Sequence, residues 1–495
     1  MSGENNNTII KNIGVLMASQ LTTWGLSLLL TIFLPRYLGP ANSGALGLAM
    51  SLWIIAGMFI SFGLDMLLTK EIARKPETIN ELVGTSIFLR VIIFFVGFAI
   101  LLVYAQFANY GREIIILICI LGISTLLGQF GLPMKSALEG LEKMEYTSAG
   151  MVGAKIFYTV FTLLMLFLHQ GLFVIALVSV GSALFDLTIT IRYSFKAYHF
   201  RPRVDLKLTK WMLRSGFPFL MVSMSQVLYA QVDIIVISLL VSTTVVLGWY
   251  GAADTLFGTM LFVPTVFLTA TFPAFSKMHM HSGEELTRLF RKSYQLILVL
   301  GIAVGLGIFI VAQPLVVLLF GEEFRQSGPV LAMMGIVIIF MYQNMILGQY
   351  LVVTDRQNEV TKAMFTAAGM TVVLDIFLVP WTQNTFGNGA IGGALAFVVT
   401  ESLMVIRFIT LIPNGVLGRS SFWLFVRAAV AGLVMVLVSW WFRRYFIAVP
   451  VIIGAFTFML MTAILRLLPS EDWITIRQFT QKVIDKISSR KTQAI

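Results

Sequence analysis

Long uncharged runs of apolar residues recur along the whole chain and do not alternate between apolar and polar positions. A helix needs about 20 mostly apolar residues to cross a bilayer, whereas the strands of a membrane barrel alternate with a period of two. The pattern therefore predicts an all-α polytopic membrane protein. Splitting the longest runs at turn residues, including His169-Gln170-Gly171, gives fourteen spans. They lie near residues 12–34, 42–64, 82–105, 114–134, 149–168, 171–191, 214–238, 245–270, 294–320, 330–352, 362–380, 390–411, 422–441 and 446–467.

The basic residues predict how these spans are oriented. With the N-terminus inside, 27 of the 35 Lys and Arg fall in cytoplasmic segments and five in outer loops, while Arg90, Lys155 and Arg427 lie within spans. Lys and Arg concentrate on the cytoplasmic side of membrane proteins, so both termini are predicted to be cytoplasmic. The polar start MSGENNNTIIK lacks the features of a signal peptide, and the first span is expected to be retained.

Composition excludes several classes of protein. Only 12% of the 495 residues are charged, about half the share of a soluble protein, which excludes an ordinary soluble enzyme. The net charge of +11 reflects the cytoplasmic loops, which favours contact with anionic membrane lipids over nucleic acid. The single cysteine, Cys119, excludes an intrachain disulfide. The sequence contains no P-loop, no clustered histidines for a metal and no potassium-filter motif.

The longest cytoplasmic loop, 192–213, carries seven basic residues with Arg214 and divides the chain. Six spans precede it and eight follow, which predicts two pseudosymmetric six-helix bundles plus a C-terminal helix pair. The predicted parts are an N-terminal bundle (1–191), a basic cytoplasmic linker (192–213), a C-terminal bundle (214–411), transmembrane helices thirteen and fourteen (412–467) and a basic amphipathic cytoplasmic tail (468–495).

A weak internal repeat supports this division. A shift of about 204 residues places Gly44 and Gly47 on Gly248 and Gly251, in each case after a short outer turn. Because six is even, the two bundles would have the same orientation and be related by an axis along the membrane normal.

Charged residues within the spans are the first candidates for function, because each costs roughly 2.5–3.5 kcal/mol at mid-bilayer. Arg90 is the deepest basic group, and both an anion contact and a structural ion pair are open to it. Lys155 is a second cavity candidate. The acids within spans are candidates for binding a coupling ion or for an ion pair: Asp186, Asp233, Asp254, Asp375 and Glu401. Of these, Asp186 and Glu401 are the ones expected to pair with Arg90 or Lys155.

Polar residues on two further helices extend this candidate cavity. Gln226, Tyr229 and Asp233 lie at positions i, i+3 and i+7, which forms one polar stripe on an otherwise apolar helix. Such a stripe is either an interhelical hydrogen-bonded seam or a cavity wall whose carboxylate takes up a proton or a sodium ion. Asn344 in the tenth span is a lesser cavity candidate, and hydrogen bonding between helices is its alternative role.

The runs LPRYLGPANSGALGLA (34–49) and FGLDMLLTKEIAR (62–74) resemble the opening of the polysaccharide-biosynthesis flippases. These flippases belong to the multidrug/oligosaccharidyl-lipid/polysaccharide exporter superfamily. The resemblance implies a multi-pass protein of the cytoplasmic (inner) membrane that moves a polyprenyl-linked oligosaccharide from the inner to the outer leaflet. On the matching positions, Asp65, Glu71 and Arg74 are expected to hold a cytoplasmic gate, and Arg36 to lie at the opposite gate.

The resemblance also implies partners but no catalytic residue, metal or bound cofactor. H⁺ or Na⁺ is expected as the coupling ion. Expected partners are membrane lipids, the lipid-linked substrate, and the glycosyltransferases, polymerase or ligase that act before and after transport. Three alternatives remain open. They are an ion-coupled multidrug exporter of the same superfamily, a peptidoglycan lipid-precursor flippase and, from another class, a membrane glycosyltransferase or polymerase.

Overall fold

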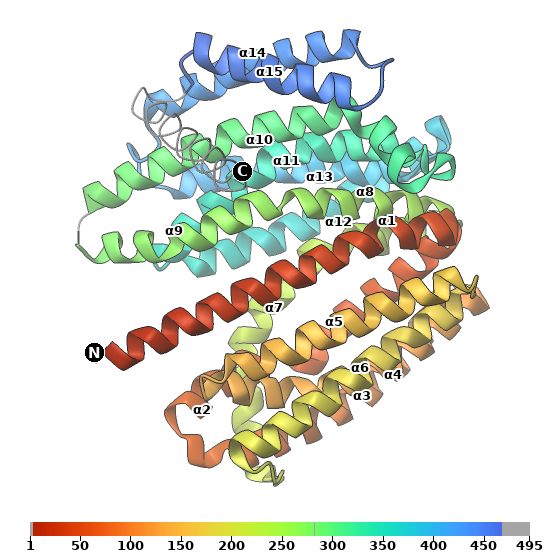
Figure 1. Cartoon of the computed structure of the whole chain (residues 1–495), viewed down its shortest axis with the longest axis vertical. Coiled ribbons are helices and arrows are strands. Elements are labelled where there is room, and N and C mark those ends of the chain that lie inside the picture. The colour runs from red at the N-terminus through yellow and green to blue at the C-terminus, as the bar shows by residue number, and fades with distance from the viewer. Residues whose placement is uncertain (1–2, 282, 468–495) are drawn as a thin grey trace, which may run out of the picture. The chain divides into compact units, whose positions relative to one another are not determined.

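The computed structural model describes residues 3–281 and 283–467, which fold into helices and turns with no strand in these ranges (Figure 1). The all-helical fold expected from the sequence is confirmed. The predicted amphipathic tail lies outside the described residues. The helices are α1 (Gly3–Ser61), α2 (Leu64–Arg74), η1 (Pro76–Thr78), α3 (Ile79–Phe107), α4 (Arg112–Gly140), α5 (Met144–Phe167), α6 (Leu172–Tyr198), α7 (Leu206–Leu240), α8 (Thr244–Met260), α9 (Phe262–His281), α10 (Gly283–Phe320), η2 (Glu322–Phe324), α11 (Ser327–Val353), α12 (Gln357–Phe386), α13 (Ala390–Leu411), α14 (Gly418–Trp441) and α15 (Ala448–Ile464).

Within the described ranges, twelve helices are long and apolar enough to cross a membrane, and α15 is a shorter apolar helix. The first of the twelve, Met17–Arg74, has 58 residues and would measure about 87 Å if straight, far more than one bilayer crossing. It is divided at Gly39, where φ is 72° and ψ is 172°, a conformation that requires glycine. Counting two crossings there, each of the fourteen predicted spans has a counterpart. The chain is a multi-pass membrane protein.

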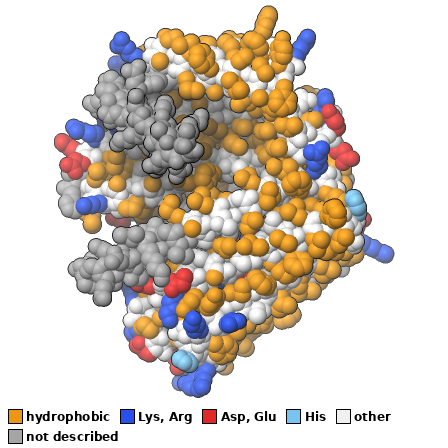
Figure 2. All heavy atoms as spheres, viewed as in Figure 1, with side chains coloured by type: hydrophobic (Ala, Val, Ile, Leu, Met, Phe, Trp, Pro, Cys, Tyr) orange, Lys and Arg blue, Asp and Glu red, His pale blue; other side chains and the backbone are white. Residues whose placement is uncertain are grey.

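The turn chosen between the fifth and sixth spans is also confirmed. α5 ends at Phe167 and α6 begins at Leu172, and His169 between them adopts a left-handed φ of 53°. Figure 2 shows that hydrophobic side chains cover much of the visible face, as lipid contact requires. The two predicted cytoplasmic termini stay a prediction.

The described residues form two compact units. The first contains residues 3–256, 316–330 and 358–400, and the second contains 257–281, 283–315, 331–357 and 401–467. In the first unit α4 packs against α3 and α6, and α5 packs against α1 and α6 (Figure 1). In the second unit α14 pairs with α15. The five-part division predicted from the sequence stays a prediction.

The segment between α6 and α7 is tied to the start of α3. The amide of Arg203 donates to the carbonyl of Asn80 at 3.1 Å, and the amide of Arg201 donates to the Asn80 side chain at 2.8 Å. A Cβ on Gly84 would lie only 2.4 Å from the Arg203 carbonyl oxygen. This close approach requires glycine at position 84 and places the basic segment across one end of the first unit.

A proline breaks the helix between α8 and α9. Pro264 has no N–H, so the carbonyl of Met260 loses its usual intrahelical donor. The hydroxyl of Tyr342 on α11 donates to this carbonyl at 2.6 Å. The side-chain hydrogen bond therefore stabilises the break at Pro264.

The repeated glycines of the two halves contact each other within the first unit. A Cβ on Gly44 would lie 2.0 Å from the Thr244 carbonyl oxygen and 2.6 Å from the Gly248 amide nitrogen. A Cβ on Gly248 would lie 1.9 Å from the Pro40 carbonyl oxygen. Equivalent positions of two repeats can touch only near the axis that relates them. The contact therefore supports the predicted repeat.

We expect Gly248→Ala to lower the free energy of unfolding by about 2 kcal/mol, because the new methyl group must push the backbone of α1 away. Gly251→Ala, three residues further along α8, is the matched control, since a Cβ there meets nothing within 4 Å. Thermal unfolding in detergent should show a lower midpoint for Gly248→Ala only. Equal midpoints for the two variants would contradict the close packing.

Candidate functional site

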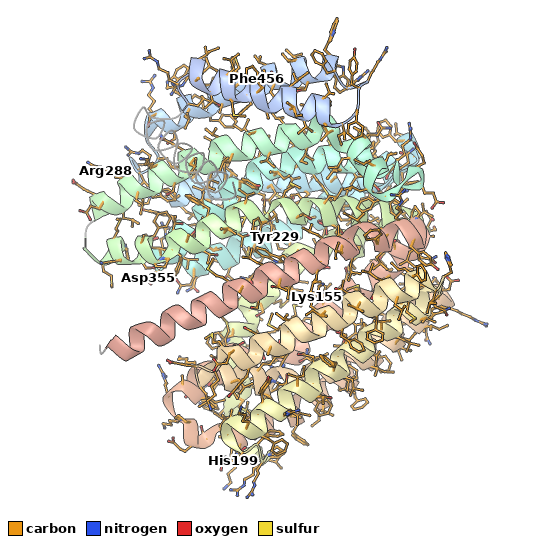
Figure 3. The ribbon with its side chains drawn as sticks, viewed as in Figure 1. Lys155, His199, Tyr229, Arg288, Asp355 and Phe456 are labelled. Carbon is orange, nitrogen blue, oxygen red and sulfur yellow. The ribbon has the colours of Figure 1, made fainter. Side chains whose placement is uncertain are left out.

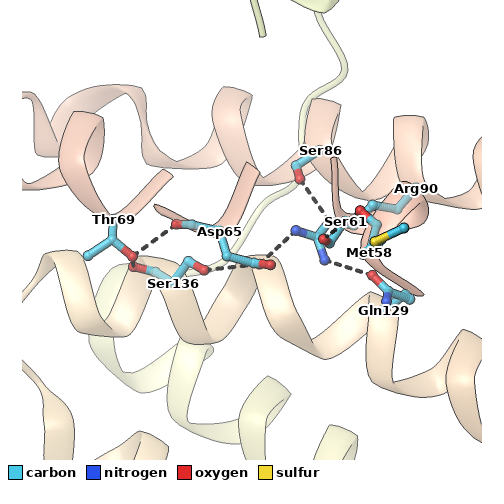
Figure 4. A network of polar contacts seen from close by, with 8 residues as sticks. All are labelled: Met58, Ser61, Asp65, Thr69, Ser86, Arg90, Gln129 and Ser136. Carbon is cyan, nitrogen blue, oxygen red and sulfur yellow. Dashed lines mark hydrogen bonds and ion pairs between the residues drawn. The ribbon is translucent and has the colours of Figure 1, made fainter. Parts of the chain in front are cut away.

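Arg90 on α3 is only 1% exposed, and each of the three nitrogens of its guanidinium donates a hydrogen bond to a neighbouring side chain (Figure 4). Nη2 donates to Asp65 Oδ1 at 2.6 Å, Nη1 to Gln129 Oε1 at 2.8 Å, and Nε to Ser86 Oγ at 3.3 Å. Charged hydrogen bonds of this length are among the stronger ones in proteins. Of the two roles that the sequence left open for Arg90, this geometry favours the structural ion pair.

The turn between α1 and α2 positions Asp65 for this pair. Phe62 and Gly63 both have positive φ, 49° and 67°, and a Cβ on Gly63 would lie 2.5 Å from the amide nitrogen of Leu220 on α7. The turn therefore needs glycine and reverses the chain directly before α2. Asp65 lies in the first turn of α2, and its carboxylate also accepts a bond from Ser136 of α4 at 3.4 Å.

The other three gate candidates lie in more accessible positions. Glu71 and Arg74, one turn apart on α2, form an ion pair at 3.5 Å. The Arg74 side chain is 63% exposed, so this pair contributes little to stability. Arg36 is exposed before the Gly39 kink. Only Asp65 of the four is joined to the buried network, and the gating role of all four stays a prediction.

Asp186 pairs with a lysine that the sequence analysis did not consider. Lys135 Nζ lies 2.5 Å from Asp186 Oδ2, and both side chains are largely buried. The sequence suggested Arg90 or Lys155 as partners of Asp186, and the structure differs on this point. Lys155 is half-buried on α5, with its ammonium 5.8 Å from the centre of the Tyr158 ring (Figure 3). Among the described residues Lys155 forms no ion pair.

Three acids from three helices come together in the first unit. Asp233 (α7), Asp254 (α8) and Asp375 (α12) interact electrostatically with one another or with Tyr250 of α8. Asp233 is 5% exposed and Asp375 is fully buried, whereas Asp254 is exposed. Both carboxyl oxygens of Asp375 and Oδ1 of Asp233 have no hydrogen-bond partner within the described structure. A buried carboxylate without a donor is costly unless a proton or a cation neutralises it.

The polar stripe on α7 runs from the surface towards this cluster. Gln226 is exposed, Tyr229 is half-buried and Asp233 is buried. The ring of Tyr229 packs edge-on against Phe397, with 6.3 Å between the ring centres. The stripe thus brings only its last member to the acidic cluster. No group of three or more His, Cys, Asp or Glu in the described ranges is arranged to hold a metal ion.

The remaining candidates, Asn344 and Glu401, meet in the second unit. Asn344 Nδ2 donates to Glu401 Oε2 at 2.8 Å and to the Glu401 backbone oxygen at 3.0 Å. Both side chains are buried, and Asn344 Oδ1 has no hydrogen-bond partner in the part of the chain described. The contact is the interhelical hydrogen bond that we expected as the alternative role of Asn344.

The second unit also contains an apolar cavity of about 500 Å³ between α10, α14 and α15. Its walls include Gly307, Met435, Gly454 and Phe458. Such a lining suits a hydrocarbon chain and offers little to a charged ligand.

Sequence reasoning missed Lys135, Gln129 and Tyr250, and also the hydroxyls of Ser86 and Ser136 that bind Arg90 and Asp65. The sequence places Lys135 in a loop because the apolar run of the fourth span stops at residue 134, whereas α4 continues to Gly140. Gln129 lies within that same apolar run, and its isolated amide was the available signal. Tyr250 gave no signal, because tyrosines are common in membrane helices.

The match to a known family covers more than half of the chain. The family model described as polysaccharide biosynthesis protein matches residues 9–279. The resemblance inferred from residues 34–74 is therefore confirmed. Among curated protein sequences, none matches this chain.

Several solved structures share the fold. A structure described as lipid II flippase MurJ in an inward closed conformation has a TM-score of 0.71 at 14% identity, covering 91% of this chain and 98% of that one. An inward-facing multidrug resistance MATE family transporter of the MOP superfamily has a TM-score of 0.60 at 14% identity, covering 81% and 98%. An outward-facing MATE family transporter has a TM-score of 0.55 at 16% identity, covering 81% and 94%. At these identities the likeness shows the fold.

Proposed function

Because the chain belongs to the polysaccharide biosynthesis protein family, we propose that it flips a polyprenyl-(pyro)phosphate-linked oligosaccharide from the inner to the outer leaflet of the cytoplasmic membrane. The observation that carries the proposal is the family match over residues 9–279 in a chain with a flippase and exporter fold. The family and the matched structures concern transporters and flippases, and we propose that this chain is likewise not an enzyme.

The buried acids supply a coupling site in this proposal. Asp233 and Asp375 form a pair of carboxyl groups in which three oxygens have no donor within the described residues. Binding one proton or one sodium ion there would neutralise one of the two carboxylates and so lower the cost of the buried charge. A site that binds an ion in one conformation and releases it in the other couples transport to the ion gradient.

Two features suit the two ends of a lipid-linked sugar. Lys155, half-buried and without an ion pair among the described residues, is the basic group that we assign to the anionic (pyro)phosphate. The apolar cavity between α10, α14 and α15 suits the polyprenyl chain. Glycosyltransferases would supply the substrate, and a polymerase or ligase would consume it.

Two related functions compete with this one. A multidrug exporter would use Asp233, Asp254 or Asp375 to bind an organic cation, and the exposed Asp254 favours that function. A peptidoglycan-precursor flippase would handle the same kind of carrier with another sugar, and a lipid II flippase is among the solved structures that share this fold. Lys155 favours an anionic (pyro)phosphate-linked substrate over an organic cation, and the family match favours a polysaccharide precursor over a peptidoglycan precursor.

The test is transport by purified protein in proteoliposomes. We expect a fluorescent polyprenyl-pyrophosphate oligosaccharide to reach the far leaflet only in vesicles that contain the protein, and faster with a proton or a sodium gradient. Whichever gradient accelerates flipping identifies the coupling ion. No movement of the lipid under either gradient, together with efflux of an organic cation, would replace this proposal by the multidrug exporter.

A further inference from the structure

A polar cavity of about 730 Å³ lies in the first unit, at the end of its helices opposite to α2. Its walls come from the α3–α4 turn, the α7–α8 turn and the part of α1 that follows Gly39. The volume falls within the range of roughly 300–1,000 Å³ that small-molecule sites occupy. None of the residues assigned above to the network, the acidic cluster or the gates lines it.

The walls offer hydrogen-bonding groups of both kinds without a net charge. Arg112 and Glu113 contribute one charge of each sign, and Asn109 contributes an amide. The hydroxyls of Tyr110 and Ser238 lie 2.7 Å apart and join the α3–α4 turn to α7. This hydrogen bond fixes the shape of the wall, while Asn109, Arg112 and Glu113 stay exposed.

Leu239 adds an exposed apolar surface to the lining, whereas Ala45, Leu48 and Leu247 are almost fully buried. An inorganic or lipid phosphate would favour a site with net positive charge, and a hydrocarbon chain would favour a lining without polar groups. A sugar needs donors and acceptors around its hydroxyls and an apolar surface below its C–H groups. We propose that this cavity binds the saccharide part of the transported lipid, an uncharged oligosaccharide segment.

The cavity lies beside a close backbone contact between α1 and α8. Ala45 follows Gly44 directly, and Leu247 precedes Gly248, the two glycines whose backbones touch. Separation of α1 from α8 would therefore enlarge the cavity. By the predicted orientation this end is the outer one, so the sugar would occupy it after crossing. The inference rests on the proposed function and adds a binding step to it.

The experiment measures binding of a free sugar to the full chain in nanodiscs. The probe is the repeat-unit oligosaccharide released by mild acid from the lipid-linked pool of the source cells, detected by saturation-transfer NMR. Thr243→Trp should fill the cavity and weaken binding at least about tenfold, since one lost pocket contact of 1.4 kcal/mol is tenfold. Thr243→Ala is the matched control, because it loses the same hydrogen bond from the Val245 amide, 3.3 Å long, without filling the cavity.

Asn109→Gly provides a second, milder variant, because it removes the exposed amide while glycine adopts the left-handed φ of 54° at this position without strain. It should weaken binding several-fold with an unchanged melting temperature. Inorganic pyrophosphate should not compete with the sugar. Equal binding by wild type, Thr243→Trp and Asn109→Gly, or no binding of the free sugar at all, would overturn the site. If pyrophosphate competes with the sugar in the wild type and Thr243→Trp abolishes this competition, the cavity is a phosphate site and the saccharide proposal is wrong.

These outcomes are independent of the flipping assay. If the wild type flips the lipid but Thr243→Trp does not change sugar binding, the proposed flippase function stands and the proposed saccharide site in this cavity is wrong. If Thr243→Trp abolishes sugar binding but the wild type flips no lipid, the cavity is a saccharide site and the proposed flippase function is wrong.

Discussion

Asp375→Asn is expected to reduce gradient-driven flipping by about 10- to 100-fold while the protein remains folded. The side chain is fully buried and neither of its oxygens has a hydrogen-bond partner among the described residues. Asparagine has nearly the same shape but no carboxyl group to take up an ion. A lost charged interaction of about 1.5–3 kcal/mol corresponds to this change in rate. Asp233→Asn should have the same effect, because the two carboxyl groups act on each other.

Asp355→Asn is the matched control for both variants. Asp355 is exposed in the turn between α11 and α12 with a φ of 60°, a conformation that asparagine adopts as readily. Flipping should be measured with a proton gradient, a sodium gradient and no gradient. If Asp375→Asn flips as fast as Asp355→Asn under the coupling gradient, the ion binds elsewhere.

The helix plan could be predicted from the sequence because it depends on local composition. An apolar run of about 20 residues must be helical in a bilayer, since no water is present to satisfy the backbone. The ends of the helices could not be predicted in the same way. α4 continues past the apolar run to Gly140 and carries Lys135 with it, because hydropathy measures the stretch within lipid and not the length of the helix.

The acidic cluster was predicted in part. Asp233, Asp254 and Asp375 stand out in sequence as acids within spans, because each is costly in a membrane. Their convergence depends on how α7, α8 and α12 pack, which no local pattern encodes. Tyr250 belongs to the cluster only because it is one turn before Asp254 on the same face of α8.

The partner of Arg90 could not be predicted for a similar reason. Asp65 is 25 residues away in sequence, and the two meet because the turn at Phe62 and Gly63 directs α2 back towards α3. That turn depends on the contact of Gly63 with α7, which is a long-range interaction. The sequence indicates that both residues are candidates for function, but only the structure shows that they contact each other.

We expect Asp65→Ala to destabilise the protein more than Arg90→Met, by about 3–5 against 1–2 kcal/mol. Removing Asp65 leaves a guanidinium that is 1% exposed without its counter-charge, and a buried unpaired charge costs about 3–5 kcal/mol. Removing Arg90 leaves a carboxylate whose side chain is 36% exposed, so water can solvate it. The double variant should therefore have a free energy of unfolding close to that of Arg90→Met, because it leaves no buried charge unpaired.

Unfolding free energies of the four proteins in this double-mutant cycle measure the coupling directly. If the two residues act only on each other, flipping should fall in proportion to the folded fraction and recover at lower temperature. A different outcome would contradict a purely structural role: the Arg90→Met variant is as stable as the wild type but no longer flips the lipid. In that case the guanidinium must leave Asp65 during transport and contact the anionic substrate, which is the other role that its position in the membrane allows.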